Sequence, residues 1–100
     1  MLSMIKNLFA RKVGLRLNVR AAITPQTALA LQSLLQATGL PGHMNVRAGL
    51  AQIELEGPQH KLQALILRLQ QQSPLFPGPV VLETGWRDFT GQFSRFTVTM

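Results

Sequence analysis

The chain has 100 residues, 46% of them hydrophobic and 14% charged, a composition typical of one globular domain with a single core. It contains no cysteine, which excludes disulfides and thiolate metal sites. Its two histidines, His43 and His60, lack helical ligand spacing, so we expect neither a metal site nor a cofactor. The net charge of +6 favours a phosphate-bearing or other anionic ligand, and it is equally compatible with ordinary solubility charge.

The composition also bears on larger partners and on location. One tryptophan and five phenylalanines are not interleaved with basic residues as in a base-stacking platform, so nucleic-acid binding is not favoured. No apolar run approaches the ~20 residues of a membrane span. The N-terminus lacks the apolar stretch and cleavage site of a signal peptide. A cytoplasmic location is therefore expected.

Residues 1–13 form a segment distinct from the domain expected over residues 14–100. Its apolar residues recur at helical spacing, with basic residues elsewhere on the helical wheel: Leu2, Ile5, Leu8 and Phe9. Three interpretations stay open. The segment is a short helix packed on the domain or on a neighbouring copy, a basic amphipathic anchor that contacts a membrane surface, or a frayed end.

The first half of the domain predicts a strand, a helix and a hairpin. Apolar and polar residues alternate over residues 15–22, which is typical of a strand with one buried face. Thr24 and Pro25 fit the N-cap and first position of a helix, and Gly39 fits its C-terminal cap. A short strand over Met44–Val46, a turn over Arg47–Gly49 and a strand over Ala51–Glu56 follow.

The second half predicts a helix and two further strands. Gly57-Pro58 ends the preceding strand, and a helical stripe follows at Leu62, Leu65, Ile66 and Leu69. A proline-rich loop over Pro74–Pro79 leads to a strand over Val80–Thr84. A last strand over Phe93–Met100 is expected to continue or flank the preceding one. The order β-α-β-β-α-β predicts an α+β, ferredoxin-like (split βαβ) two-layer sandwich, an antiparallel sheet with two helices on one face.

In this plan the first and third strands are central neighbours, and we expect them to run parallel. Arg16 and Arg20 then share the open face of the sheet with Glu54 and Glu56. We expect cross-strand ion pairs between these two groups. The open face is then solvated, or covered by a partner or by the N-terminal segment.

Several motifs in this order resemble the acylphosphatase family. Gly39–Asn45, Gly49-Leu50 and Glu56-Gly57-Pro58 resemble its "GL-x-G-x-V-x-N … G-x-V … EGP" run. Trp86 followed by Thr90–Val98 is similar to its C-terminal "TG-x-F-x-x-F-x-I" strand. The resemblance covers residues 14–100. It implies hydrolysis of carboxyl-phosphate anhydrides by a glycine-rich loop of backbone N–H groups, an arginine that holds the phosphate and an asparagine that orients water.

The chain departs from this family at the residues that would perform the chemistry. The family's "GRVQGVGFR" loop corresponds to Arg20–Ala28, where every glycine is absent and Pro25 removes a backbone donor. The position of the catalytic arginine falls on Ala28. Asn45 lies one residue early, so either a shortened hairpin restores it or Val46 takes the catalytic position.

Three functions follow from these observations. In the first, the domain has lost acylphosphate hydrolysis and acts by binding or assembly, through a rim of polar residues: Arg20, Thr24, Gln26, Thr27, Asn45 and Arg47. Within that rim, Thr24, Gln26 and Thr27 are the candidate anion-binding residues. In the second, it is a divergent acylphosphatase in which Arg20 or Arg47 reaches the phosphate, with Asn45 as the remaining catalytic candidate. In the third, it is an oligomerisation module that pairs with another copy through its sheet.

Overall fold

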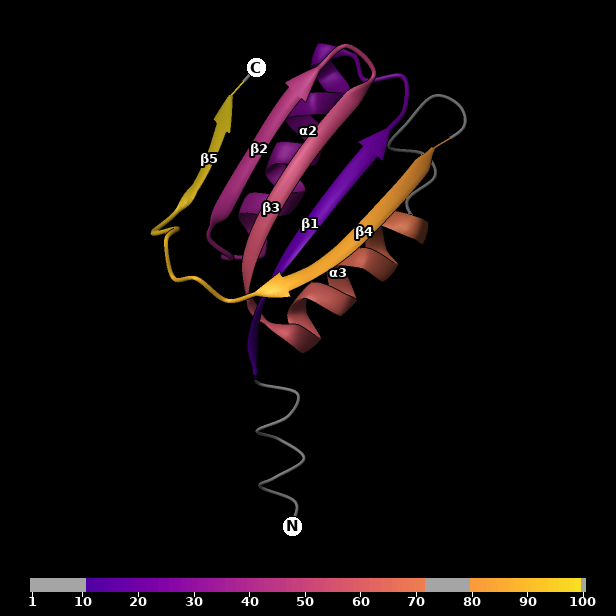
Figure 1. Cartoon of the computed structure of the whole chain (residues 1–100). Coiled ribbons are helices and arrows are strands. Elements are labelled where there is room, and N and C mark those ends of the chain that lie inside the picture. Colours follow the sequence, from indigo (N-terminus) through magenta and orange to yellow (C-terminus); the bar gives the residue numbers. More distant parts are fainter. Residues whose placement is uncertain (1–10, 72–79, 100) are drawn as a thin grey trace.

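The computed structural model describes residues 11–71 and 80–99. The predictions made for residues 1–10 of the N-terminal segment 1–13, for Pro74–Pro79 and for Met100 therefore lie outside the described residues. Two helices cover one face of a five-stranded sheet, and the other face is open (Figure 1). The elements in chain order are β1 (Lys12–Arg20), α2 (Pro25–Ala37), β2 (Gly42–Arg47), β3 (Leu50–Pro58), α3 (Gln59–Gln71), β4 (Val81–Asp88) and β5 (Phe96–Thr99). The predicted two-layer ferredoxin-like plan is confirmed, and β1 begins two residues before the predicted domain boundary.

The strand order in the sheet is β4-β1-β3-β2-β5. The two central strands, β1 and β3, are antiparallel, so the predicted parallel pairing is wrong. The reason lies in the connections. The α2 crossover returns the chain so that β2 runs parallel to β1, and the tight β2–β3 hairpin then reverses its direction. Arg16 nevertheless faces Glu54 in this register, as expected.

The last strand lies at an unexpected place. β5 does not continue or flank β4; it pairs in parallel with β2 at the opposite edge of the sheet. The connection from β4 to β5 therefore passes from one edge of the sheet to the other (Figure 1). A pattern of alternating residues predicts that a strand exists, but it does not say which edge the strand joins.

Helix α2 begins and ends where its caps were predicted. The Thr24 hydroxyl accepts a hydrogen bond from the Thr27 N–H at 3.1 Å, and Pro25 occupies the first turn. Gly39 follows the helix with φ +72°, a left-handed conformation that residues with a Cβ adopt at a cost. These local signals place the helix independently of its packing.

The core lies between the helices and the inner face of the sheet. Leucines from both helices pack there against the central strands, and the largest fully buried side chains are Leu15, Leu17, Leu31, Leu35, Met44, Ile53, Leu55, Leu62 and Val19. Burying such side chains supplies most of the stability, at ~1.5–3 kcal/mol each. Within the described residues no helix is long and apolar enough to cross a membrane.

Candidate functional site

Part of the polar rim predicted from the sequence lies where β1 meets α2. The Ala21 N–H donates to the Gly49 carbonyl oxygen at 3.2 Å, which joins the end of β1 to the tip of the β2–β3 hairpin. Thr24, Gln26 and Thr27 belong to the first turn of α2 or its cap, and Arg47 ends β2. The structure thus brings the hairpin tip to the β1–α2 connection.

The N-terminus of α2 has little left to offer an anion. Pro25 has no N–H group, the Thr27 N–H is bonded to the Thr24 hydroxyl, and the Ala28 N–H donates to the Thr24 carbonyl oxygen at 2.9 Å. The two threonine hydroxyls also bond each other at 2.9 Å. Within the first turn of α2, the groups that could cradle a phosphate are therefore absent or already engaged, with the exception of the Gln26 N–H.

Helix α2 and the loop before it carry no lysine or arginine. No lysine or arginine occurs between Arg20 and Arg47, so α2 carries no basic residue. Arg20 lies on the open face, where its Nε donates to the Glu83 carboxylate on β4 at 3.1 Å and not to the expected Glu54 or Glu56. Ala28, the counted position of the family arginine, is 2% exposed and faces the core.

Asn45 and Val46 occupy opposite faces of the sheet. Asn45 lies opposite Gln52 on the open face, and Val46 packs against the core on the side that carries α2. Asn45 and Val46 were the two alternatives for the catalytic asparagine position, and only one of them can face a given side of the sheet. Asn45 lies with open-face residues and not with the first turn of α2.

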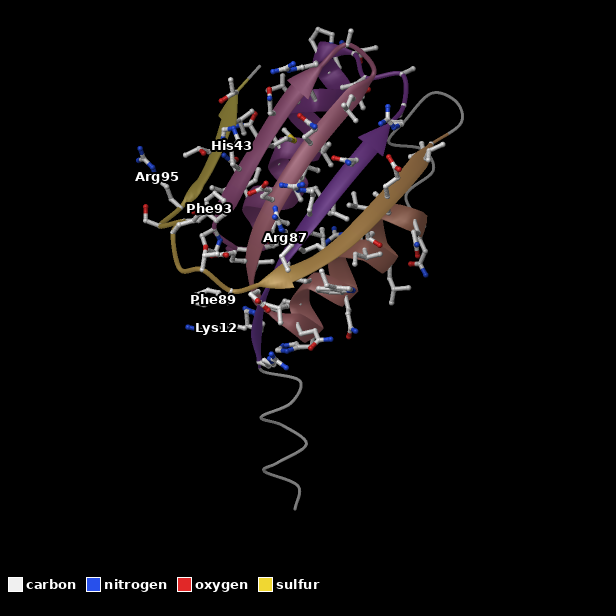
Figure 2. The ribbon with its side chains drawn as sticks, in the orientation of Figure 1. Lys12, His43, Arg87, Phe89, Phe93 and Arg95 are labelled. Carbon is white, nitrogen blue, oxygen red and sulfur yellow. The ribbon has the colours of Figure 1, made fainter. Side chains whose placement is uncertain are left out.

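A polar hollow on the open face was not predicted from the sequence. Its volume is about 470 Å³, and three side-chain amides from neighbouring strands line it: Asn18, Gln52 and Asn45. Asn18 Oδ1 is buried and has no hydrogen-bond partner among the described residues. His43 and Phe93 border the same hollow, and Figure 2 shows both beside β2 and β5. Each ring nitrogen of His43 bonds a β5 threonine, at 2.7 and 3.2 Å.

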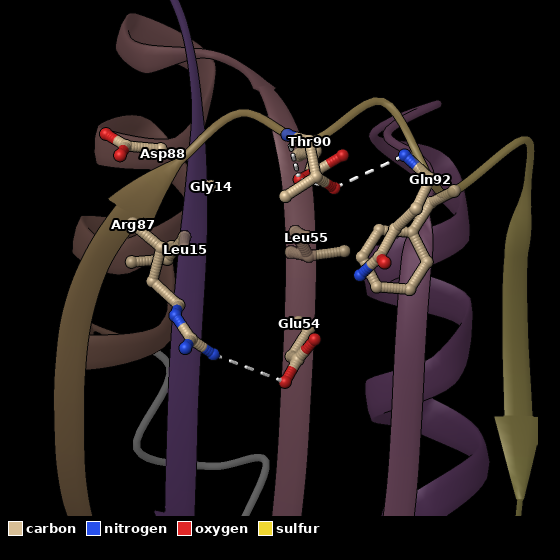
Figure 3. Close-up of a pocket in the computed structure, with 10 residues that line it drawn as sticks. Gly14, Leu15, Glu54, Leu55, Arg87, Asp88, Thr90 and Gln92 are labelled. Atoms are coloured by element: carbon tan, nitrogen blue, oxygen red, sulfur yellow. Dashed lines mark hydrogen bonds and ion pairs between the residues drawn. The ribbon is translucent and has the colours of Figure 1, made fainter.

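Glu56 anchors the connection between β4 and β5. This glutamate is 4% exposed, and its carboxylate accepts hydrogen bonds from the Thr90 N–H at 2.8 Å, the Thr90 hydroxyl at 2.7 Å and the Gly91 N–H at 3.0 Å. A second hollow of about 330 Å³ lies beside it (Figure 3). The motif Glu56-Gly57-Pro58 signalled an element boundary, but nothing in it identified an anchoring residue.

The remaining charges of the open face form exposed ion pairs. Arg16 reaches the Glu54 carboxylate at 3.0 Å, which confirms one expected cross-strand pair. Arg87, on β4, approaches the same carboxylate at 3.9 Å (Figure 3). These side chains are between 39% and 54% exposed, so each pair contributes at most about 1 kcal/mol.

Comparison with known proteins identifies the fold. No family model and no curated protein matches this sequence. Among solved structures, the acylphosphatase from Bacillus subtilis is 20% identical with a TM-score of 0.73, over 88% of this chain and 99% of that one. An acylphosphatase from Coxiella burnetii is 13% identical with a TM-score of 0.63, over 87% and 92%.

The same fold is shared by a protein of another description. A BLUF protein in its dark state is 16% identical with a TM-score of 0.59, over 90% of this chain and 74% of that one. The chain is therefore an acylphosphatase-like domain in its fold. Because one fold supports unrelated functions, the function must be argued from the residues of the site.

Proposed function

We propose that this acylphosphatase-like domain has lost acylphosphate hydrolysis and acts by binding or assembly. The observation that carries the proposal is the shortage of free hydrogen-bond donors and basic residues at the N-terminus of α2. Apart from the Gln26 N–H, its first-turn donors are absent or bonded within the cap, and no lysine or arginine lies between Arg20 and Arg47 in the sequence. Phosphoryl chemistry depends on donors and cations aimed at the developing charge, and removing one such donor typically lowers the rate by ~10²–10³-fold.

The divergent-enzyme alternative requires Arg20 or Arg47 to replace the missing arginine. Arg20 is paired with Glu83 across the open face, on the side of the sheet away from α2. Arg47 is exposed at the end of β2. Asn45 faces the open side as well, so Arg20 and Asn45 lie with open-face residues and not with the first turn of α2.

A hydrolysis assay with benzoyl phosphate tests the proposal directly. We expect no turnover above the spontaneous rate, with the acylphosphatase from Bacillus subtilis as the positive control. Arg47→Ala and Arg20→Ala serve as matched variants. Turnover that survives repurification and falls in either variant would overturn the proposal in favour of the divergent enzyme.

Titration with inorganic phosphate, followed by backbone amide NMR, adds a readout that does not depend on catalysis. In an active acylphosphatase used as the control, phosphate should shift the backbone amide signals of its anion site. At the same phosphate concentrations we expect the amide signals of Gln26 and Thr27 in this chain to stay unchanged. A saturable shift at these two amides would show a working anion site and would also contradict the proposal.

A further inference from the structure

Strand β4 presents a long free edge. It spans Val81–Asp88, pairs with β1 on one side, and has no strand on its other side in the part of the chain that the structure describes (Figure 1). Seven of its eight residues are exposed. Natural sheets shorten such edges or place proline and charged residues, especially lysine, on them, because unpaired backbone groups recruit other strands. β4 contains neither proline nor lysine, and its charged residues, Glu83, Arg87 and Asp88, are of both signs.

The exposed apolar side chains of the domain gather along this strand. Six large hydrophobic residues are exposed among the described residues, and four of them lie on β4 or beside its ends: Val80, Val81, Trp86 and Phe89. Val81 is 55% exposed and Trp86 is 46% exposed. An apolar edge of this kind is typical of a strand that is covered by a partner.

We propose that β4 pairs antiparallel with β4 of a second copy of this chain, about a two-fold axis that passes through Gly85. The two sheets then form one continuous sheet, with the helix layers of both copies on the same side. The proposal rests on the assembly part of the proposed function and names the surface and the partner.

Charge complementarity selects this register. Residues of one face are opposite each other when the axis lies at Gly85, so Glu83 of each copy faces Arg87 of the other, twice by symmetry. Both side chains are 54% exposed on the open face and thus within reach of a neighbouring strand. At the two ends of the seam, Val81 of one copy faces Phe89 of the other.

Other registers lack these pairs. An axis at Glu83 sets two carboxylates against each other, and an axis at Arg87 does the same with two guanidinium groups, which destabilises a sheet. An axis at Thr84 or Trp86 leaves Glu83 opposite an uncharged residue. The residue on the axis lies directly opposite the same residue of the second copy, so it needs space on that face of the strand. Gly85 has this space, because no heavy atom lies within 4 Å of the place where a Cβ would lie.

A single-cysteine scan tests both the edge and the register, because the natural sequence has no cysteine. Residues directly opposite in an antiparallel pair have Cα atoms about 4.5–5.5 Å apart, within the range of roughly 4.4–6.8 Å that a disulfide bridges. We expect Gly85→Cys to form a covalent dimer rapidly at low protein concentration. Val81→Cys and Thr84→Cys on the same strand, and Thr97→Cys on β5, are the controls. Faster cross-linking at any control would overturn the proposal.

Charge reversal gives an independent test by light scattering across protein concentrations. The unmodified protein should reach a mass near twice its 11.0 kDa. Glu83→Arg or Arg87→Glu should raise the dimer dissociation constant by about tenfold or more, and the double exchange should restore it. Two variants control for side effects. Arg20→Ala breaks the internal pair with Glu83 without reversing the seam, and Arg47→Glu changes the charge on another strand.

The outcomes separate this proposal from the proposed loss of hydrolysis. A monomeric protein at all concentrations, or a dimer that both reversals leave intact, would overturn the β4 pairing whatever the benzoyl phosphate assay shows. Circular dichroism of each variant confirms that a monomeric mass reflects a lost interface and not an unfolded chain.

Discussion

Replacing Glu56 with glutamine is expected to weaken the fold far more than the same change two residues earlier. The Glu56 carboxylate accepts three hydrogen bonds from Thr90 and Gly91 and is 4% exposed. A hydrogen bond to a charged group contributes ~1.5–3 kcal/mol, and the three bonds share one carboxylate, so they do not add in full. Glutamine keeps one acceptor oxygen and presents an NH₂ group to the remaining donors. We estimate a loss of about 2–4 kcal/mol in the free energy of unfolding.

Urea unfolding followed by circular dichroism measures this loss. For a domain of this size a loss of 1 kcal/mol lowers Tm by ~4–8 °C, so a thermal melt should show a decrease of roughly 8–32 °C. Glu54→Gln is the matched control on the same strand and face. It removes an ion pair whose partners are 39% and 50% exposed, and should lower stability by at most about 1 kcal/mol. Equal losses in the two variants, or unchanged hydrogen-exchange protection of the Gly91 amide in Glu56→Gln, would refute the anchoring role.

Three further substitutions test the local arguments. Thr24→Ala removes the N-cap of α2 and should lower the unfolding free energy by about 1 kcal/mol, whereas the exposed Gln26→Ala should change it little; chemical denaturation of both decides. Gly42→Ala should be strongly destabilising in a thermal melt, because its Cβ would overlap the β3 backbone, whereas Gly85→Ala, with open space at its Cβ, should be tolerated. Leu31→Ala should lower stability by ~2–5 kcal/mol through a core cavity, measured by urea unfolding.

The elements of this fold were predictable from short-range signals in the sequence. Thr24, Pro25 and Gly39 define the limits of α2 because caps act on neighbouring backbone groups. The alternation over residues 51–56 predicts a strand with a buried face, which β3 has. Such signals concern residues within one turn or one strand, and they were reliable for that reason.

The arrangement of elements that are distant in the sequence was harder to predict from the sequence. The direction of β3 relative to β1 depends on counting chain reversals, and the place of β5 depends on which free edge the chain reaches. Glu56 was expected to form an exposed ion pair, but the chain folds the segment around Thr90 over it. The amides of Asn18, Gln52 and Asn45 are brought together by pairing across three strands, a register that no local pattern specifies.

The path of the chain after β4 affects how many copies can join through the edges of the sheet. β5 covers the outer edge of β2 and presents only a four-residue edge of its own, which leaves β4 as the one long free edge of the described sheet. A self-complementary long edge closes at two copies about a two-fold axis, whereas a second long edge permits continued growth.

Releasing the segment that Glu56 holds should therefore change the size of the assembly as well as the stability. In Glu56→Ala we expect β5 to detach more often from β2, which exposes the longer edge of β2 and allows species larger than a dimer. Light scattering over time at high protein concentration measures this growth. Leu31→Ala is the control, because it destabilises the core and keeps the contacts of Glu56 with Thr90 and Gly91. If both variants grow at the same rate once their stabilities are matched, general unfolding drives the growth and the proposed protection of the β2 edge is wrong.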